Sequence, residues 1–159
     1  MAYTIAQRIG KLLLAKNLTL SVCESCTGGM LGSIITSVAG SSKYFLGGVV
    51  AYADNVKQEI VGVRSQTLQR CGAVSTAAVR EMALGIKKRM RSDIGIAITG
   101  IAGPGGGSGI KPIGTVYIAI VVRKRITMQR CLFKGSRQEI RRAACAKTLD
   151  MLEQMLISM

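Results

Sequence analysis

Residues 93–99, Asp-Ile-Gly-Ile-Ala-Ile-Thr, form a run in which nearly every position is apolar. A strand with one face in water alternates apolar and polar residues, whereas a strand buried on both faces does not alternate. Patterns typical of amphipathic helices precede the run, at residues 4–16 and 76–91. A central strand covered by helices is the arrangement of an α/β protein with a parallel sheet, and we expect that class here.

A second apolar run, residues 18–22, leads into the polar turn Glu-Ser-Cys-Thr-Gly-Gly, and a helical pattern over residues 27–38 follows. A strand, a tight turn and a helix in this order expose a serine hydroxyl, here Ser25, at the edge of a sheet. The backbone N–H groups of Thr27, Gly28 and Gly29 would then face a ligand, with no glycine side chain in the way. The alternative is a simple helix cap, in which Ser25 or Thr27 is the N-cap residue.

The remaining pattern completes an α/β unit. Residues 45–52 read as a strand in which a double glycine, Gly47-Gly48, indicates a bulge or a close backbone approach. Tyr52 ends this strand, and a short helix carrying Lys57 follows. Residues 114–122 and 126–133 are separated by a short basic turn, which predicts an antiparallel hairpin.

Residues 100–109 contain six glycines and lie between two predicted strands. Such a segment is typical of a flexible linker, but long structureless loops between strands are uncommon unless they have a function. We therefore favour a ligand-binding loop whose backbone N–H groups face an anion. The spacing matches neither a Walker motif nor a dinucleotide-binding fingerprint.

The sequence contains no histidine, which excludes a Ser-His-Asp triad and most zinc hydrolase sites. A serine nucleophile in this chain would need a lysine or a tyrosine as its partner. Five cysteines form no disulfide framework, and the C-x-x-C pair Cys23 and Cys26 lacks the further ligands of a zinc site. We expect reduced, buried cysteines, no metal and no cofactor.

The formal net charge is +14, which favours an anionic partner such as a nucleotide phosphate, a nucleic acid or an acidic surface. Six aromatic residues and no tryptophan make a base-stacking surface improbable, so nucleic acid is disfavoured. No apolar run is long enough to span a bilayer, and the start of the chain lacks the pattern of a secretory signal. We expect a single cytoplasmic domain over residues 1–159 that does not associate with membranes.

The ordered motifs of the chain together resemble the CinA C-terminal domain family, the nicotinamide-nucleotide amidohydrolases, in its stand-alone form. The resemblance covers nearly the whole chain, although Cys23 stands where the family more often has alanine. The blocks that carry it are Glu24-Ser25-Cys26-Thr27-Gly28-Gly29, Gly47-Gly48-Val49-Val50-Ala51-Tyr52 with Lys57, Gly72-Ala73-Val74-Ser75, Thr99-Gly100-Ile101-Ala102-Gly103-Pro104, and Lys111-Pro112-Ile113-Gly114-Thr115-Val116.

The resemblance implies a three-layer α/β/α sandwich on a mixed, mostly parallel sheet with a C-terminal antiparallel hairpin. It also implies hydrolysis of the carboxamide of nicotinamide mononucleotide (NMN) to nicotinate mononucleotide and ammonia, as a step in pyridine nucleotide recycling. Ser25 is the implied nucleophile and forms an acyl-enzyme. Lys57 is the implied base, which requires burial to keep part of its amine neutral, and Tyr52 would relay the proton or orient Lys57.

The same resemblance implies a set of substrate-binding residues: Thr27, Gly28, Gly29, Thr99, Gly100, Gly103, Arg137 and Arg141. The two arginines lie in the first turns of a final helix, where positive charge opposes the helix dipole, and this makes them candidates to bind the phosphate. We expect a small nucleotide substrate and a homo-oligomer. The alternative is a non-enzymatic competence- or damage-associated protein, or a nucleic-acid-binding protein, on the same fold.

Overall fold

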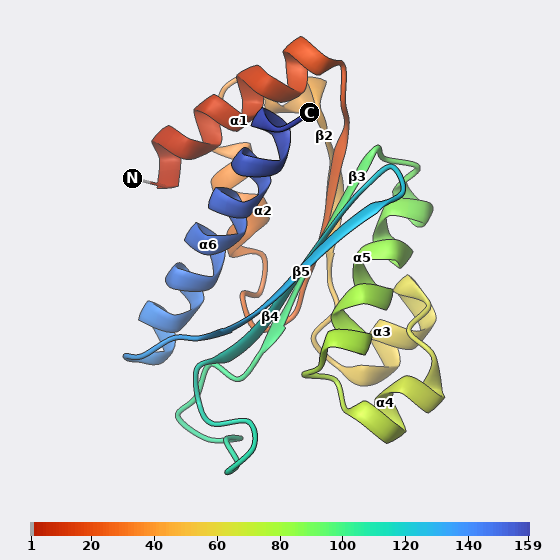
Figure 1. Cartoon of the computed structure of the whole chain (residues 1–159), viewed down its shortest axis with the longest axis vertical. Coiled ribbons are helices and arrows are strands. Elements are labelled where there is room, and N and C mark those ends of the chain that lie inside the picture. The colour runs from red at the N-terminus through yellow and green to blue at the C-terminus, as the bar shows by residue number, and fades with distance from the viewer. Residues whose placement is uncertain (1) are drawn as a thin grey trace.

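The computed structural model describes residues 2–159, with side chains from residue 4 onward. Figure 1 shows a sheet seen nearly edge-on between two groups of helices. The elements are α1 (Ala2–Lys16), β1 (Leu20–Glu24), α2 (Met30–Thr36), a 3-10 turn (Ser41–Lys43), β2 (Phe45–Val50), α3 (Asp54–Val61), α4 (Ser65–Cys71), α5 (Thr76–Met90), β3 (Ile94–Gly100), β4 (Thr115–Val122), β5 (Arg125–Leu132) and α6 (Arg137–Ile157).

The five strands form one sheet in the order β2-β1-β3-β4-β5. β1 pairs in parallel with both β2 and β3, whereas β4 is antiparallel to β3 and β5 is antiparallel to β4. Only β4 therefore runs against the other strands. The predicted mixed sheet with its C-terminal hairpin is confirmed.

Helices α1, α2 and α6 cover one face of the sheet, and α3, α4 and α5 cover the other (Figure 1). Along β3 the large side chains of Ile94, Ile96 and Ile98 pack toward α1 and α6, while Ala97 faces α5. A side chain at Gly95 would place its Cβ only 2.3 Å from the Ala83 carbonyl oxygen, so α5 lies directly on the strand. The apolar run is thus buried on both faces, which confirms the predicted three layers.

The start of α2 and the end of β2 differ from the sequence prediction. α2 begins at Met30 and not at Thr27, because Gly28 and Gly29 have left-handed backbone, with φ of 58° and 93°. β2 ends at Val50, which leaves Tyr52 in the loop beyond the strand. At Gly48 a Cβ would lie 2.5 Å from the Val22 side chain, so the predicted close approach is confirmed.

Side chains cap the starts of α5 and α6. Ser75 Oγ accepts a hydrogen bond from the Ala78 N–H at 3.1 Å at the start of α5. Ser136 and Glu139 form a capping box at the start of α6. Within residues 2–159, no helix is both long enough and apolar enough to cross a membrane.

The half-buried carboxylate of Asp93 joins the beginnings of β1 and β3. Asp93 Oδ2 accepts hydrogen bonds from the Thr19 backbone N–H at 2.8 Å and from the Thr19 hydroxyl at 2.7 Å. The Thr19 hydroxyl in turn accepts from the Asp93 N–H at 3.0 Å. The two bonds donated by Thr19 hold the pKa of Asp93 below its usual value.

Replacing Asp93 with Ala should destabilise the fold by about 2 kcal/mol at neutral pH, because hydrogen bonds to a charged acceptor are lost. A carboxyl whose pKa is lowered on folding stabilises above its ordinary pKa and loses that effect as pH falls through the lowered value. The difference in Tm between wild type and Asp93→Ala should therefore shrink below about pH 4. Asp150→Ala, which removes a half-exposed carboxylate, is the control; a gap for Asp93→Ala that stays constant between pH 7 and pH 3 would contradict the assignment.

Candidate active site

Ser25 follows the last residue of β1, where the sheet changes its winding direction. From β1 the chain crosses to β2 on one side, and from β2 it crosses back to β3 on the other side of β1. In open α/β sheets, ligands bind at such a switch point beyond the carboxyl ends of the strands. The Ser25 N–H donates to the Ile98 carbonyl of β3 at 2.9 Å, which fixes the start of the turn.

A cavity of about 220 Å³ opens at this point. Its lining brings together six of the predicted site residues from five separate segments. The lining residues are Ser25, Cys26, Tyr52, Asp54, Lys57, Ala73, Val74, Thr99, Gly100, Ala102 and Arg137. The lining contributions of Cys26, Asp54, Ala73, Val74 and Ala102 were not predicted; all of them except Asp54 lie inside motifs quoted for the family resemblance.

Glu24 is a buried acid that sequence reasoning missed. Its side chain is 1% exposed, and its carboxylate accepts from the backbone N–H groups of Gly29 at 3.1 Å, Leu31 at 3.0 Å and Gly32 at 2.8 Å. The first turn of α2 is thereby satisfied from within the protein. A ligand therefore meets no free donors at the start of this helix, contrary to the prediction.

The free donors lie earlier, inside the turn. The Gly28 N–H is also taken, because it donates to the Ser25 carbonyl at 3.0 Å. No other residue among residues 2–159 accepts a hydrogen bond from the N–H group of Cys26 or of Thr27. The Ser25 hydroxyl likewise makes no hydrogen bond to any other described side chain or carbonyl, so it is available at the cavity wall.

Lys57 is the most deeply buried charged side chain among the lining residues, with 2% exposure. Its Nζ donates to the Tyr52 backbone carbonyl at 2.9 Å and lies 3.5 Å from Asp54 Oδ1. Asp54 is 59% exposed, so the attraction between the two charges is screened by water. An ammonium has three donors, and one position on Nζ remains for a group in the cavity.

Arg137, from the first turn of α6, also lines the cavity. Its Nη2 donates to the Tyr52 hydroxyl at 2.9 Å and its Nη1 donates to the Gly103 carbonyl at 2.7 Å. The guanidinium thereby links α6 to the glycine-rich loop and to the loop after β2. Tyr52 bonds to Lys57 through its backbone carbonyl, and its hydroxyl bonds to Arg137 instead.

Arg141, one turn further along α6, is not among the lining residues. Its Nη2 donates to the Thr27 carbonyl at 2.8 Å and its Nη1 donates to Gln138 at 3.0 Å. A Cβ at Gly28 would lie 3.4 Å from Nη2, so the guanidinium packs against the turn that follows Ser25. The predicted arginine pair is thus divided between the cavity and the turn.

Thr99 and Gly100, at the end of β3, form part of the cavity lining. The Thr99 hydroxyl donates to the Ala73 carbonyl at 2.9 Å, which holds the loop before α5 against β3. A Cβ at Gly100 would come within 2.7 Å of the Val116 side chain, so only glycine fits beside β4. Thr27, Gly28 and Gly29 form the turn but do not line the cavity.

The C-x-x-C cysteines lie on opposite faces of the sheet. Cys23 packs in the core beneath α5, whereas Cys26 packs in the core beneath α6. All five cysteines are free, and burial raises the pKa of Cys23 to about 12 and that of Cys26 to about 11. Within the described residues, no three cysteine, aspartate or glutamate side chains gather as a metal site would require.

Comparison with known proteins places this geometry in a family. The model of the CinA C-terminal domain matches residues 2–156. A CinA-like protein of Crocosphaera subtropica is 48% identical over 156 residues, which is 97% of this chain and 38% of that protein. The chain spans a little over a third of the length of the curated relatives it matches.

Two solved structures are similar over nearly their whole length. A competence-damaged protein (CinA) superfamily protein from Klebsiella pneumoniae superposes with a TM-score of 0.96 at 34% identity, covering 100% of this chain and 99% of that one. The competence/damage inducible protein CihA from Agrobacterium tumefaciens gives a TM-score of 0.94 at 38% identity, covering 98% of this chain and 94% of that one.

Thiol labelling should separate the cysteines by burial. With a pKa of about 11, roughly one Cys26 side chain in three thousand is a thiolate at pH 7.5, and the thiolate is the reactive form. In native protein, iodoacetamide should label the exposed Cys71 and leave Cys23 and Cys26 unlabelled until unfolding, as read by peptide mass spectrometry. Labelling of Cys26 as fast as Cys71, or a disulfide between Cys23 and Cys26, would contradict this assignment.

Proposed function

Because the chain belongs to the CinA C-terminal domain family, we propose that it hydrolyses the carboxamide of NMN to nicotinate mononucleotide and ammonia. The observation that carries this proposal is the free Ser25 hydroxyl on a cavity that also holds the buried amine of Lys57. A serine and a lysine can carry out acyl transfer where no histidine exists. The pyridinium ring of NMN withdraws electrons from the amide carbonyl, which favours attack by an alcohol.

In the proposed first step, Ser25 Oγ bonds to the carboxamide carbon while its proton passes to neutral Lys57. Lys57 then returns the proton to the amide nitrogen, and the carbon–nitrogen bond breaks. Ammonia departs, and the acyl group remains on Ser25 as an ester. A water molecule next attacks the ester and gives its proton to Lys57. The bond between the carbon and the Ser25 oxygen breaks, Lys57 returns that proton to Ser25, and the carboxylic acid product releases its remaining proton to solvent to become the carboxylate.

The N–H group of Cys26, a residue that lines the cavity, is the proposed donor to the oxyanion. No other described residue accepts a hydrogen bond from it, whereas the Thr27 N–H, also without a partner residue, belongs to a fully buried residue outside the lining. A preorganised donor of this kind contributes about 3 to 4 kcal/mol in other acyl-transfer enzymes. This moves the proposed oxyanion site from the helix start to the turn.

The size of the cavity supports a divided binding site. About 220 Å³ is small beside the pockets that bury a complete drug-sized ligand, and it suits a substituted ring. We assign the pyridine carboxamide to the cavity and the ribose phosphate to its rim. Arg137 lies at that rim with two of its five N–H donors in use, so three remain for a phosphate.

The direct test is ammonia release from NMN by purified protein in the presence of a chelator. Wild type should be active, and Ser25→Ala should lose at least a thousandfold in kcat because the nucleophile is absent. Lys57→Met should lower kcat far more than it raises KM, since a base acts in the transition state. Near wild-type turnover by Ser25→Ala would refute the assignment of the nucleophile, and a loss of affinity alone in Lys57→Met would make that residue a binding contact.

The two arginines should give different kinetic signatures, because one faces the cavity rim and the other faces the turn. Arg137→Met should raise KM for NMN about tenfold or more while changing hydrolysis of nicotinamide riboside little, since the riboside has no phosphate. Arg141→Met should lower kcat on both substrates, because the Thr27 carbonyl loses its partner. Equal effects of the two variants on both substrates would contradict this division of roles.

A further inference from the structure

Eight of the 22 lysines and arginines gather at the end of the sheet opposite the cavity. Three connections meet there: α1 to β1, α5 to β3, and the turn between β4 and β5. Figure 1 shows the β4–β5 turn beside the end of α5, at the far end of the molecule from the glycine-rich loop that follows β3. We call this surface the basic end, defined by Lys16, Lys87, Lys88, Arg89, Arg91, Arg123, Lys124 and Arg125.

Almost nothing neutralises the basic end from within the protein. Among the described residues, none of its eight cations takes part in an ion pair closer than 4 Å. Asp93 is the acid beside Lys87 and Arg123, but its carboxylate is occupied by Thr19. Glu59 lies on the rim, where it lines a shallow hollow together with Lys88, Arg89 and Arg91.

Two arginines of this surface have left-handed backbone, a conformation that glycine or asparagine adopts at lower energy. Arg91 ends α5 with φ of 53°, and Arg123 begins the β4–β5 turn with φ of 54°. Helix ends and hairpin turns of this conformation favour glycine or asparagine. The one other described non-glycine residue with left-handed backbone is Asn17, a residue type that tolerates it.

Placing arginine at both positions works against the backbone, and it adds positive charge to one surface. The dipole of α5 accounts for the cations in its last turn, but it does not account for the cations of the β4–β5 turn. Binding of an anionic partner would explain the arginines with left-handed backbone and the cations of the β4–β5 turn. The basic end therefore points to a partner with many negative charges.

We propose that the basic end binds the phosphate backbone of double-stranded nucleic acid without reading its sequence. Duplexes present a dense row of phosphates, and arginine-rich surfaces bind them by releasing counterions. Tyr52 is the one large aromatic side chain that is exposed among residues 4–159, and it lies at the cavity. Bases thus find no stacking partner at the basic end, which favours duplex over single strands. Its three loops also lack the exposed tryptophan, phenylalanine or leucine that anchors a protein in a bilayer.

This site is separate from the catalytic proposal and does not depend on it. The cavity lies beyond the carboxyl end of β1, whereas the basic end lies beyond the amino ends of β1 and β3 (Figure 1). A duplex held there leaves the mouth of the cavity open. Enzyme activity and nucleic-acid binding, which the sequence presents as alternatives, are then compatible properties of one chain.

The test uses a fluorescein-labelled 20-base-pair DNA of random sequence, fluorescence anisotropy, and salt from about 50 to 200 mM. The key variant is R91G/R123G, because glycine suits the left-handed backbone and this variant should melt at or above the wild-type Tm. Wild type should bind with a steep salt dependence. The slope of log K against log salt should fall by about 1.8 in R91G/R123G, which removes two phosphate contacts.

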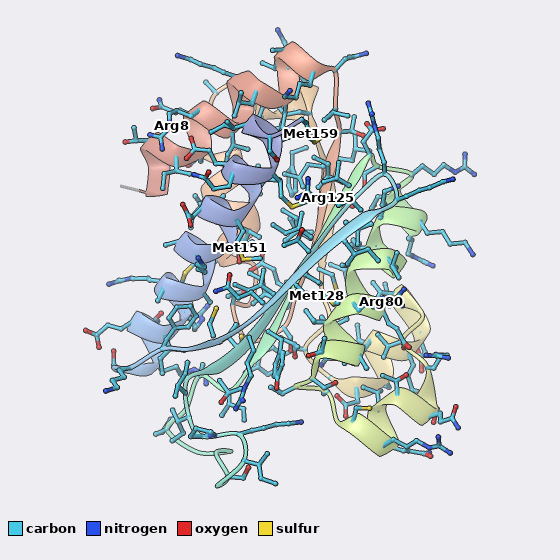
Figure 2. The ribbon with its side chains drawn as sticks, viewed as in Figure 1. Arg8, Arg80, Arg125, Met128, Met151 and Met159 are labelled. Carbon is cyan, nitrogen blue, oxygen red and sulfur yellow. The ribbon has the colours of Figure 1, made fainter. Side chains whose placement is uncertain are left out.

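The matched control is R70S/R80S, which removes two exposed cations from α4 and α5 (Figure 2 labels Arg80) and has the same net charge as the key variant. Its slope should equal that of wild type. Absence of wild-type binding at 50 mM salt, or equal loss in both double variants, would overturn the proposal. So would binding to phosphatidylserine vesicles in place of DNA. Ammonia release from NMN is measured in parallel and should be unchanged in R91G/R123G.

Discussion

The buried carboxylate of Glu24 is the contact on which the candidate site depends. An anion removed from water is costly unless donors surround it, and three backbone N–H groups of the α2 start provide them. In return, the first turn of α2 needs no cap from Ser25 or Thr27. Ser25 is therefore free of the capping role that its position in the sequence also permits, and its hydroxyl remains at the cavity wall.

The same contact sets the shape of the turn. With Glu24 fixed to Gly29 and Ser25 fixed to β3, the chain between them must reverse within a few residues, and left-handed backbone at Gly28 and Gly29 accomplishes this. Arg141 donates to the Thr27 carbonyl, and no other described residue accepts a hydrogen bond from the N–H groups of Cys26 and Thr27. The glycines thus serve the backbone, and not primarily the approach of a ligand.

Local patterns in the sequence were sufficient for the layers and most elements. The apolar run of β3 and the hairpin each depend on neighbouring residues, and each was confirmed. Contacts between distant segments were not predictable in this way. Arg137 and Arg141 bind different segments, and Cys23 and Cys26 pack in different cores. Both differences depend on how α6 and the helices on each face pack against the sheet. The start of α2 was misplaced because Glu24 caps it from the preceding strand. The proposed roles of the site residues stay predictions.

The central claim is that Ser25 forms a covalent intermediate, and rapid quenching measures this most directly. Wild-type protein is mixed with NMN, quenched with acid within the first turnover, digested, and mapped by mass spectrometry. The account predicts a nicotinate mononucleotide ester on the peptide that contains Ser25, absent in Ser25→Ala and reduced in Lys57→Met. Turnover of NMN with no adduct on Ser25 at any quench time, together with an active Ser25→Ala variant, would contradict it.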